Sequence, residues 1–307
     1  MRKLTFIVNP VAGGRRQRAG ELRLIRQLRE AASDAEILVT ERPGQALDWA
    51  RERRWDDERV VVAAGGDGTV HEVGGGLIGG RAALGVLPVG SGNDFAKMLD
   101  TPADPGRAVE FFHRAEVRAC DVGEVRIGHR DGRQTQHYFL NGLGIGYEAV
   151  VADAAARARL LSGAARYVVA ALWHLVAYRP PSMTLKLGES THEGPMFLVA
   201  VGNGRCAGGR FYLTPGAVID DGLLDVCFTQ TTAVPKLLRR LLAVFRGRHG
   251  RFSDIATERT EALEIACAEG CMAHADGELL ARRAVRMEVR VLPGVLPVAV
   301  SAGSGRR

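Results

Sequence analysis

Three glycine-rich turns carry the residues with the clearest chemical potential. They occupy residues 9–14, 65–69 and 90–94, and each follows a short apolar run. Glycine lets backbone N–H groups approach phosphate oxygens closely, and a helix that begins at such a turn favours negative charge at its N-terminus. Two of the turns also contain an aspartate, Asp67 and Asp94. Carboxylates beside an anion site indicate a divalent cation that bridges them to phosphate.

The elements that must position these turns alternate between strand and helix. We expect strands at residues 4–8, 36–40, 60–64 and 83–88, and helices at 19–32, 45–55 and 70–78, with another helix beginning at 93–99. This alternation predicts a doubly wound parallel sheet with helices on both faces. Ligands of such a sheet bind at the carboxyl ends of its strands, so we expect the three turns along one edge.

The pattern changes after residue 121 to short strands with hairpin-type turns. We expect strands at residues 122–127, 138–141, 183–187, 196–201, 223–228, 263–268 and 285–292, and one long helical segment over 147–178. Asp131-Gly132 and Asp221-Gly222 are turn signals. We therefore predict an α/β domain at residues 1–121 and a mostly antiparallel β domain at 122–292. The sequence leaves open whether the tail, residues 293–307, returns to the first domain.

Composition and missing motifs exclude several classes of protein. The 307 residues are 46% hydrophobic and 25% charged, with a net charge of +6, as in a soluble globular protein. The odd number of cysteines, five, disfavours a disulfide framework and favours a cytoplasmic location. No P-loop, Rossmann glycine motif or H-E-x-x-H zinc motif occurs. His129-Arg130-Asp131 resembles a protein-kinase catalytic loop, but Gln136 stands where that loop needs asparagine.

The ordered set of motifs resembles the diacylglycerol kinase catalytic-domain family, and more closely its YegS-like bacterial lipid kinases, which are related to sphingosine kinases. Beyond the three turns, the likeness rests on residues 121–123, 141–146, 214–215, 221–225 and 276–278. The G-G-D-G turn alone is shared with NAD kinases and 6-phosphofructokinases. The resemblance implies an N-terminal α/β domain that binds ATP and a C-terminal antiparallel β-sandwich that binds the lipid.

The resemblance also implies roles for individual carboxylates. Glu278 matches the family's proposed general base, and Asp276 lies beside it. Asp67, Asp94 and Asp121 would form the network around a catalytic Mg²⁺. A second, structural Mg²⁺ would bind Asp221 and the backbone carbonyls of Val218 and Leu223.

The same resemblance implies which residues line the ATP site. They are Asn9, Pro10, Val11, Ala12, Gly13, Thr40, Gly65, Gly66, Asp67, Gly68, Thr69, Val70, His71, Glu72 and Ser91. His71 departs from the family, which more often has asparagine there, and this puts one nucleotide contact in doubt. The chemistry fits the residue types, because phosphoryl transfer to an alcohol depends mostly on positioning and charge neutralisation.

A basic stretch indicates how the protein would meet a membrane. No acidic residue occurs between Val226 and Ser253, and six basic residues fall within 236–251. Leucines at helical spacing among them predict a basic amphipathic helix suited to an anionic membrane surface, which implies peripheral attachment. A solvated helix packed by its leucines is the alternative. Nucleic acid is a poor partner for this stretch because few aromatic residues are interleaved.

Three functional hypotheses follow. The first is an ATP-dependent lipid kinase that phosphorylates the hydroxyl of a diacylglycerol-like lipid, whether diacylglycerol, phosphatidylglycerol or a sphingoid base, in a cleft facing the β domain. The second is an NAD kinase-like phosphotransferase. The third is a non-catalytic regulator that binds nucleotide or lipid. The presence of every expected carboxylate favours the first. The sequence is compatible with a homodimer.

Overall fold

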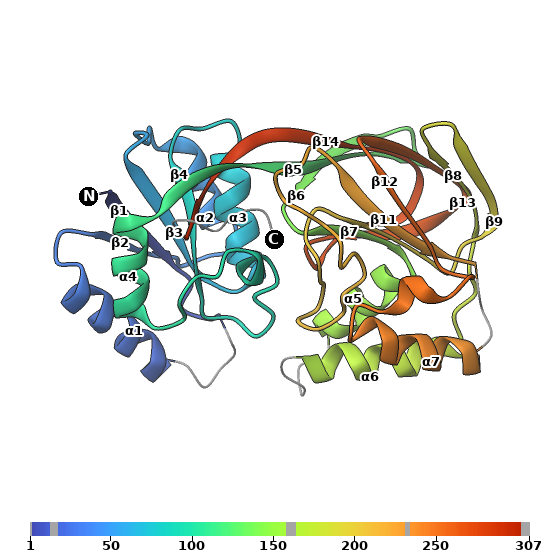
Figure 1. The fold of residues 1–307 in the computed structure, drawn as a ribbon, viewed down its shortest axis with the longest axis horizontal. Coiled ribbons are helices and arrows are strands. Elements are labelled where there is room, and N and C mark those ends of the chain that lie inside the picture. Colours follow the sequence, from blue (N-terminus) through green and yellow to red (C-terminus); the bar gives the residue numbers. More distant parts are fainter. Residues whose placement is uncertain (1, 13–17, 158–163, 231–233, 302–307) are drawn as a thin grey trace. The chain divides into compact units, whose positions relative to one another are not determined.

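The chain divides into two compact units in the computed structural model (Figure 1). The structure describes residues 2–12, 18–157, 164–230 and 234–301. Unit 1 comprises Met1–Cys120 and Gly294–Arg307, and unit 2 comprises Asp121–Pro293. The long strand β14 (Glu278–Val300) belongs to both units, because its first part lies in unit 2 and its last residues in unit 1.

Unit 1 is an α/β domain with a parallel sheet. Its strands are β1 (Lys3–Val8), β2 (Glu36–Val39), β3 (Arg59–Gly65) and β4 (Ala83–Pro88). Its helices are α1 (Arg18–Ala31), α2 (Gln45–Glu52), α3 (Asp67–Leu77), the short 3₁₀ helix η1 (Phe95–Met98) and α4 (Pro105–Arg114). The parallel order is β4-β3-β1-β2, and the end of β14 joins β4, with Val298 opposite Leu84.

The predicted doubly wound architecture is confirmed by the burial of both sheet faces. Helix α1 packs against α4, and α2 packs against α3. Alternate strand residues such as Phe6 and Val62 join the core that contains α1 and α4. Their neighbours along the strands, including Ile7 and Val61, have no exposed area either. Continuous burial of this kind is typical of parallel strands covered on both sides.

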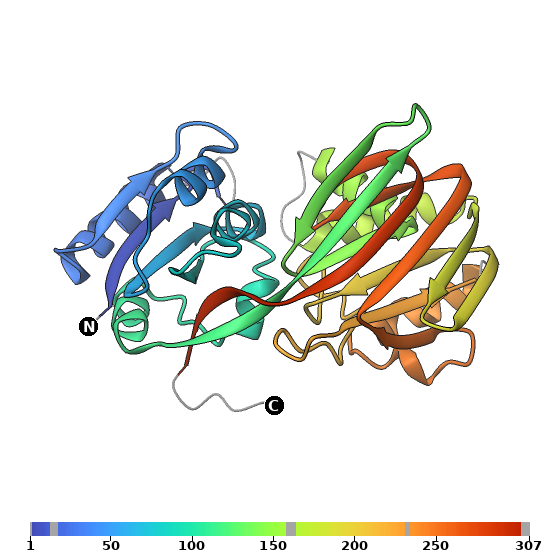
Figure 2. The same cartoon turned by 90° about the horizontal axis from the view of Figure 1, so that it is seen from above.

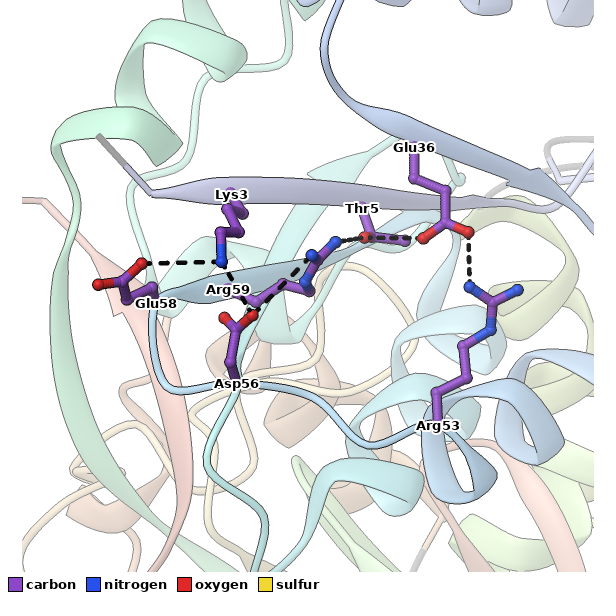
Figure 3. Close-up of polar contacts among 7 residues, drawn as sticks. All are labelled: Lys3, Thr5, Glu36, Arg53, Asp56, Glu58 and Arg59. Atoms are coloured by element: carbon purple, nitrogen blue, oxygen red, sulfur yellow. Dashed lines mark hydrogen bonds and ion pairs between the residues drawn. The ribbon is translucent and has the colours of Figure 1, made fainter.

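A charged network closes the amino-terminal edge of this sheet (Figure 3). It comprises Lys3, Thr5, Glu36, Arg53, Asp56, Glu58 and Arg59. Arg59 donates to the Thr5 hydroxyl at 2.8 Å, and that hydroxyl donates to Glu36 at 3.3 Å, so three strands are joined. Because ligands of such sheets bind at the opposite, carboxyl edge, we interpret this network as structural.

Unit 2 is built on antiparallel strands (Figure 2). They are β5 (Glu116–His129), β6 (Gln134–Phe139), β7 (Gly142–Gly146), β8 (Ser182–Leu187), β9 (Ser190–Pro195), β10 (Leu198–Gly202), β11 (Leu224–Thr229), β12 (Ala256–Thr260), β13 (Ala262–Ala275) and the first part of β14. The main order is β12-β11-β10-β7-β13-β14. The hairpin β8–β9 pairs with β13, and the hairpin β5–β6 pairs with β14. One core cluster joins these strands and has Phe139, Ile145 and Ile265 among its members.

The described residues of unit 2 also form the helices α5 (Tyr147–Arg157), α6 (Ala164–Leu175) and α7 (Val234–Val244) and the 3₁₀ turn η2 (His249–Arg251). The single helix predicted over 147–178 is therefore two helices in the structure. None of the helices in the described ranges is long and apolar enough to span a membrane.

The basic helix is shorter than the predicted 236–251. Helix α7 ends at Val244, and the remaining basic residues follow in a turn and in η2. The physical reason is a glycine cap. Gly247 has φ +60°, its N–H donates to Val244, and the N–H of Arg248 donates to Ala243. These paired bonds around a left-handed glycine form the Schellman motif that terminates helices.

Candidate active site

The three glycine-rich turns meet at the carboxyl edge of unit 1. Asn9, after β1, donates through Nδ2 to the Thr69 hydroxyl at 3.0 Å. The turns after β3 and β4 touch backbone to backbone, since a Cβ on Gly90 would collide with the Cα of Gly66. A Cβ on Gly65 would likewise collide with Thr69. Glycine at these positions is therefore a packing requirement, and it keeps the edge lined by backbone.

Asp67 holds the turn at residues 90–94 in place. Its Oδ2 accepts the N–H of Asn93 at 2.9 Å, and its Oδ1 accepts the N–H of Asp94 at 2.6 Å. Asn93 has φ +54°, in the left-handed region, and its side chain bonds both backbone groups of Gly90. The Asp67 carboxylate thus fixes a strained turn to the start of α3. The two aspartates of the turns lie side by side as a result.

Asp94 forms an ion pair that the sequence prediction did not include. Asp94 is buried, with its side chain 8% exposed, and the Lys97 ammonium lies 2.8 Å from Oδ1. Lys97 is one of four lysines in a chain whose other basic residues are all arginine. The spacing from Asp94 to Lys97 is i,i+3 across η1, and that spacing was the available signal. A lysine at this edge adds positive charge where phosphate would bind.

The other predicted ATP-site residues fall into two groups. Val11, Gly68 and Ser91 are exposed at the edge, where a ligand could reach them. Thr40 and Glu72 act within the fold. Thr40 is buried and its hydroxyl donates to Val8 at 3.4 Å, and Glu72 accepts the N–H of Gly44 at 3.0 Å.

Pro10 and Ala12 belong to the turn after β1, whereas Val70 and His71 lie in helix α3, where Val70 is buried. Gly13 lies outside the described residues.

The N-terminus of α3 is suited to hold an anion at this edge. The helix begins at Asp67 directly after the glycine turn, and the N–H of Val70 already donates to Gly66. The first N–H groups of a helix lack partners within the helix, and its dipole adds partial positive charge there. Phosphate oxygens fit this position.

The carboxylates of this edge fit a magnesium ion that is shared with a nucleotide. Within the described ranges, no cluster of three or more His, Cys, Asp or Glu side chains forms a complete metal site. Mg²⁺ usually binds through one or two carboxylates together with substrate phosphates and water. Asp67 and Asp94 supply oxygen donors of this kind beside the anion-binding helix.

In unit 2, Asp276 anchors the hairpin that carries Glu278. Its carboxylate accepts three backbone N–H groups, from Leu140 at 2.8 Å and from Asn141 and Gly142 at 2.9 Å each. Its own N–H donates to Gly142 at 2.9 Å. Asp276 was predicted as a catalytic neighbour of Glu278. Its contacts are those of a residue that positions the hairpin.

Glu278 follows a two-residue turn at the tip of that hairpin. Asp276 and Gly277 have φ values of +49° and +89°, and Ala275 pairs with Glu278 across the turn. Two left-handed residues in succession are typical of the type I′ turn, in which asparagine or aspartate precedes glycine. The side chain of Glu278 is exposed, as a base that must meet an incoming hydroxyl requires.

Asp121 is buried and is connected to the same hairpin by a chain of hydrogen bonds within unit 2. Its Oδ2 accepts the N–H of Gly222 at 2.7 Å. Buried Asn203 donates both to the Asp121 carbonyl at 3.0 Å and to the Leu140 carbonyl at 2.7 Å. Leu140 in turn donates to Asp276. Sequence reasoning missed Asn203, which carries no motif signal beyond its polarity directly after the apolar strand β10.

The predicted second metal site contains an ion pair. Arg259 bonds the Asp221 carboxylate closely and contacts Asp225 at 3.3 Å. Asp221 also accepts the N–H of Leu223 at 3.1 Å. Burial raises the pKa of the Asp225 carboxyl, and the charge of Arg259 opposes this rise. A metal at Asp221, with the carbonyls of Val218 and Leu223, would have to displace Arg259, and this site stays a prediction.

Comparisons with known proteins agree with the division into two units. Residues 3–125 match the diacylglycerol kinase catalytic domain, and residues 142–300 match the YegS C-terminal NAD kinase beta sandwich-like domain. A Pseudomonas aeruginosa protein named probable lipid kinase YegS-like is 32% identical over 278 residues, which cover 90% of this chain and 88% of the relative. Mycobacterium tuberculosis diacylglycerol kinase is 30% identical over 242 residues, or 78% and 76% of the two chains.

Solved structures show the same fold. A putative diacylglycerol kinase from Bacillus anthracis superposes with a TM-score of 0.74 at 24% identity, covering 98% of this chain and 97% of the other. Yeast NADH kinase is more distant, with a TM-score of 0.53 at 11% identity and coverage of 99% and 84%. The chain therefore belongs to the diacylglycerol kinase and YegS-like lipid kinase family, in which a diacylglycerol kinase catalytic domain precedes a β-sandwich domain.

Proposed function

We propose that the protein transfers the γ-phosphoryl group of ATP to the hydroxyl of a diacylglycerol-like lipid. Unit 1 binds ATP at the edge formed by the three glycine-rich turns, and unit 2 presents the lipid. The observation that carries this proposal is the pair of hydrogen bonds accepted by the Asp67 carboxylate. They hold the glycine-rich turn at residues 90–94 against the turn at 65–69, at the N-terminus of α3.

The nucleotide phosphates are held by backbone and by charge. N–H groups at the start of α3 and the close-packed turns at Gly66 and Gly90 would hold the phosphate oxygens. Lys97, beside Asp94, adds a cation to this edge. Asp67 and Asp94 would hold Mg²⁺ together with the phosphates, and the ion would supply neutralisation of the charge that develops during transfer.

Glu278 accepts the proton of the acceptor hydroxyl. The bond from the γ-phosphorus to the β,γ-bridging oxygen breaks, and a bond from the lipid oxygen to the γ-phosphorus forms. ADP leaves with the bridging electrons, and the hydroxyl proton passes to the Glu278 carboxylate. A positioned carboxylate is suited to take this proton late in the transfer. Asp276 fixes the backbone next to this base through its three N–H contacts.

The substrate is identified by offering γ-labelled ATP and Mg²⁺ with lipids in mixed micelles. The panel holds diacylglycerol, phosphatidylglycerol, sphingosine, ceramide and undecaprenol, with NAD as the water-soluble acceptor. We expect label in one glycerolipid or sphingoid base. Label in NAD alone would replace the proposal by the NAD kinase-like alternative. Absence of label from every acceptor would favour a binding protein.

We further propose that α6 and α7 bring the enzyme to an anionic membrane surface. The two helices lie on the same side of the sandwich and share a core cluster through Leu175 and Leu237 (Figure 1). Both expose large apolar side chains, with Trp173 81% and Leu242 66% exposed. Exposed tryptophan and leucine beside basic residues are typical of helices that lie in a membrane interface.

The basic residues of this region are not equivalent. Lys236, Arg239 and Arg246 are exposed. Arg240 instead bonds Asp254, with Nε at 2.9 Å from Oδ1, and its guanidinium lies over the Phe252 ring at 4.8 Å, closer than that of Arg239 at 5.7 Å. Arg240 therefore ties α7 to the chain that follows it, and we exclude it from the membrane contact.

This surface is tested by reversing three charges to glutamate at Lys236, Arg239 and Arg246. Each basic residue near an anionic bilayer contributes about 1 kcal/mol, so removing three should weaken binding by about 100-fold or more. Co-sedimentation with phosphatidylglycerol vesicles measures the effect. The matched control makes the same charge change on exposed residues of α1 in unit 1. These are Arg23, Arg26 and Arg29. Equal loss in both triple variants would show that net charge, and not this surface, governs binding.

A further inference from the structure

A buried histidine on β13 contacts the turn that precedes Glu278. His274 is 5% exposed, and its Nδ1 accepts the N–H of Gly277 at 3.2 Å. Gly277 is the second residue of the turn and is joined directly to Glu278. A neutral imidazole accepts at one nitrogen and carries its proton on the other, so the His274 proton lies on Nε2.

A carboxylate on α5 faces that proton. Oε1 of Glu148 lies 3.5 Å from Nε2 of His274, and both side chains are largely buried. Among the described residues, neither the Nε2 of His274 nor the Oε2 of Glu148 has a hydrogen-bond partner. Two buried polar groups without other partners are costly unless they serve each other or a water between them. We therefore interpret Glu148 and His274 as an interacting pair of buried side chains.

Gly144 makes room for the pair. A Cβ on Gly144 would lie 2.6 Å from the Glu148 Cδ and would collide with His274 Nε2. Gly144 lies on β7 and pairs with His274 across the sheet. The side chains of His274 and Glu148 therefore leave no room for a Cβ at residue 144. This accounts for a glycine inside a buried strand.

We propose that Glu148 and His274 are positioning residues for the general base Glu278. Glu148 orients the His274 ring, and the ring fixes the N–H of Gly277 and thereby the backbone direction at which Glu278 leaves the turn. This inference rests on the proposed function, because it assigns a base to be positioned. Phosphoryl transfer is sensitive to such placement, since a displacement of about 1 Å can cost about 100-fold in rate.

The same helix offers a matched comparison at the same hairpin. Asp153 of α5 holds Arg282 of β14 with two bonds, at 2.9 and 3.1 Å. Burial would raise the pKa of the Asp153 carboxyl, but hydrogen bonds from Arg282 and Arg157 outweigh it and hold that pKa below its usual value. The contact between Asp153 and Arg282 joins α5 to the β13–β14 hairpin at a point away from the turn at residues 276–277. Its loss should weaken the fold without redirecting Glu278.

The test compares four variants: His274→Leu, His274→Asn, Glu148→Gln and Asp153→Asn. The asparagine Oδ1 can replace Nδ1 as acceptor for the Gly277 N–H, and the glutamine keeps an oxygen that can face Nε2. We expect His274→Leu to lower kcat by about 10- to 100-fold with an unchanged KM for ATP. His274→Asn should recover most of that loss, and Glu148→Gln should lose only a few-fold. Asp153→Asn should lower Tm and keep kcat.

A second readout is independent of activity. Hydrogen exchange of the Gly277 amide, followed by NMR of the full chain, should quicken in His274→Leu and return toward wild type in His274→Asn. Unchanged exchange in His274→Leu would overturn the proposal, as would quickened exchange with wild-type kcat. A wild-type enzyme that phosphorylates no lipid would refute the proposed function. The exchange rate of the Gly277 amide in His274→Leu would then test, without an activity assay, whether His274 holds the Gly277 N–H.

Discussion

Replacing Asp67 by asparagine should damage stability and activity together. The carboxylate holds two N–H groups of the turn at residues 90–94, at 2.9 and 2.6 Å. An asparagine keeps one acceptor oxygen and turns an NH₂ group toward the other N–H. One of the two charge-assisted hydrogen bonds is then lost, because the amide NH₂ of the asparagine and a backbone N–H face each other and both are donors. Hydrogen bonds to charged groups contribute about 1.5–3 kcal/mol, so we expect the free energy of unfolding to fall by about 2–3 kcal/mol.

The activity loss has a separate cause. The strained residue Asn93, with φ +54°, and the backbone at Asp94 lose the contact that holds them beside α3. The asparagine also removes one negative charge from the carboxylates that would hold Mg²⁺. We expect transfer from labelled ATP to fall by about 100-fold or more at saturating lipid.

Guanidinium unfolding and the transfer assay measure the two effects. The control is Asp48→Asn, since Asp48 also lies in the first turn of a helix but forms an exposed pair with Arg42. Exposed pairs contribute about 0–1 kcal/mol, so the control should stay near wild type in both assays. An Asp67→Asn protein with wild-type stability and turnover would refute this account of the turn and of the site.

Three further outcomes are expected. Gly90→Ala should lower the free energy of unfolding by about 1–3 kcal/mol and weaken ATP binding, because its Cβ would collide with the backbone of Gly66; unchanged calorimetric binding would contradict this. Asp276→Asn should lower Tm and kcat, since three N–H groups lose a charged acceptor, and a normal Tm would show that water replaces it. Burial lowers the pKa of His249 below 6.5. The imidazole of His249 therefore binds a proton more readily in the unfolded chain than in the folded protein. The contribution of His249 to stability is consequently present above pH 6.5 and is lost as the pH falls. Tm should consequently drop less between about pH 7 and pH 5 in His249→Gln, whose amide can still donate to the Leu213 carbonyl, than in wild type.

The α/β half of the fold could be predicted closely because its signals are local. The strand over 83–88 has the bounds that its apolar run indicates; β1 begins one residue before its predicted start, and β3 extends one residue beyond its prediction at each end. Helix α4 was missed although Asp104 caps it and Pro105 begins it, which are ordinary start signals. Strands β9 and β12 were missed because they are polar and largely exposed. Their position depends on pairing with β8 and β11.

The meeting of the three glycine-rich turns at one edge was predictable, but the contacts between their side chains were not, and the roles of the site residues stay predictions. Glycine and aspartate types identify a phosphate edge, and parallel strands place the turns together. That Asp67 anchors a neighbouring turn depends on long-range contacts of 26 and 27 residues in sequence, which no local pattern contains. The same holds for the contacts of Asn203 with Asp121 and of Glu148 with His274, which join residues far apart in sequence.

The central claim is that Glu278 is the base for transfer from ATP bound to unit 1. The most direct test compares wild type with Glu278→Gln for ATP affinity by calorimetry and for label transfer to the lipid that wild type phosphorylates. Glu278 is exposed, so the substitution should leave the fold intact. We predict unchanged ATP affinity and a loss of transfer by about 100-fold or more. Wild-type transfer by Glu278→Gln would contradict the assignment of the base.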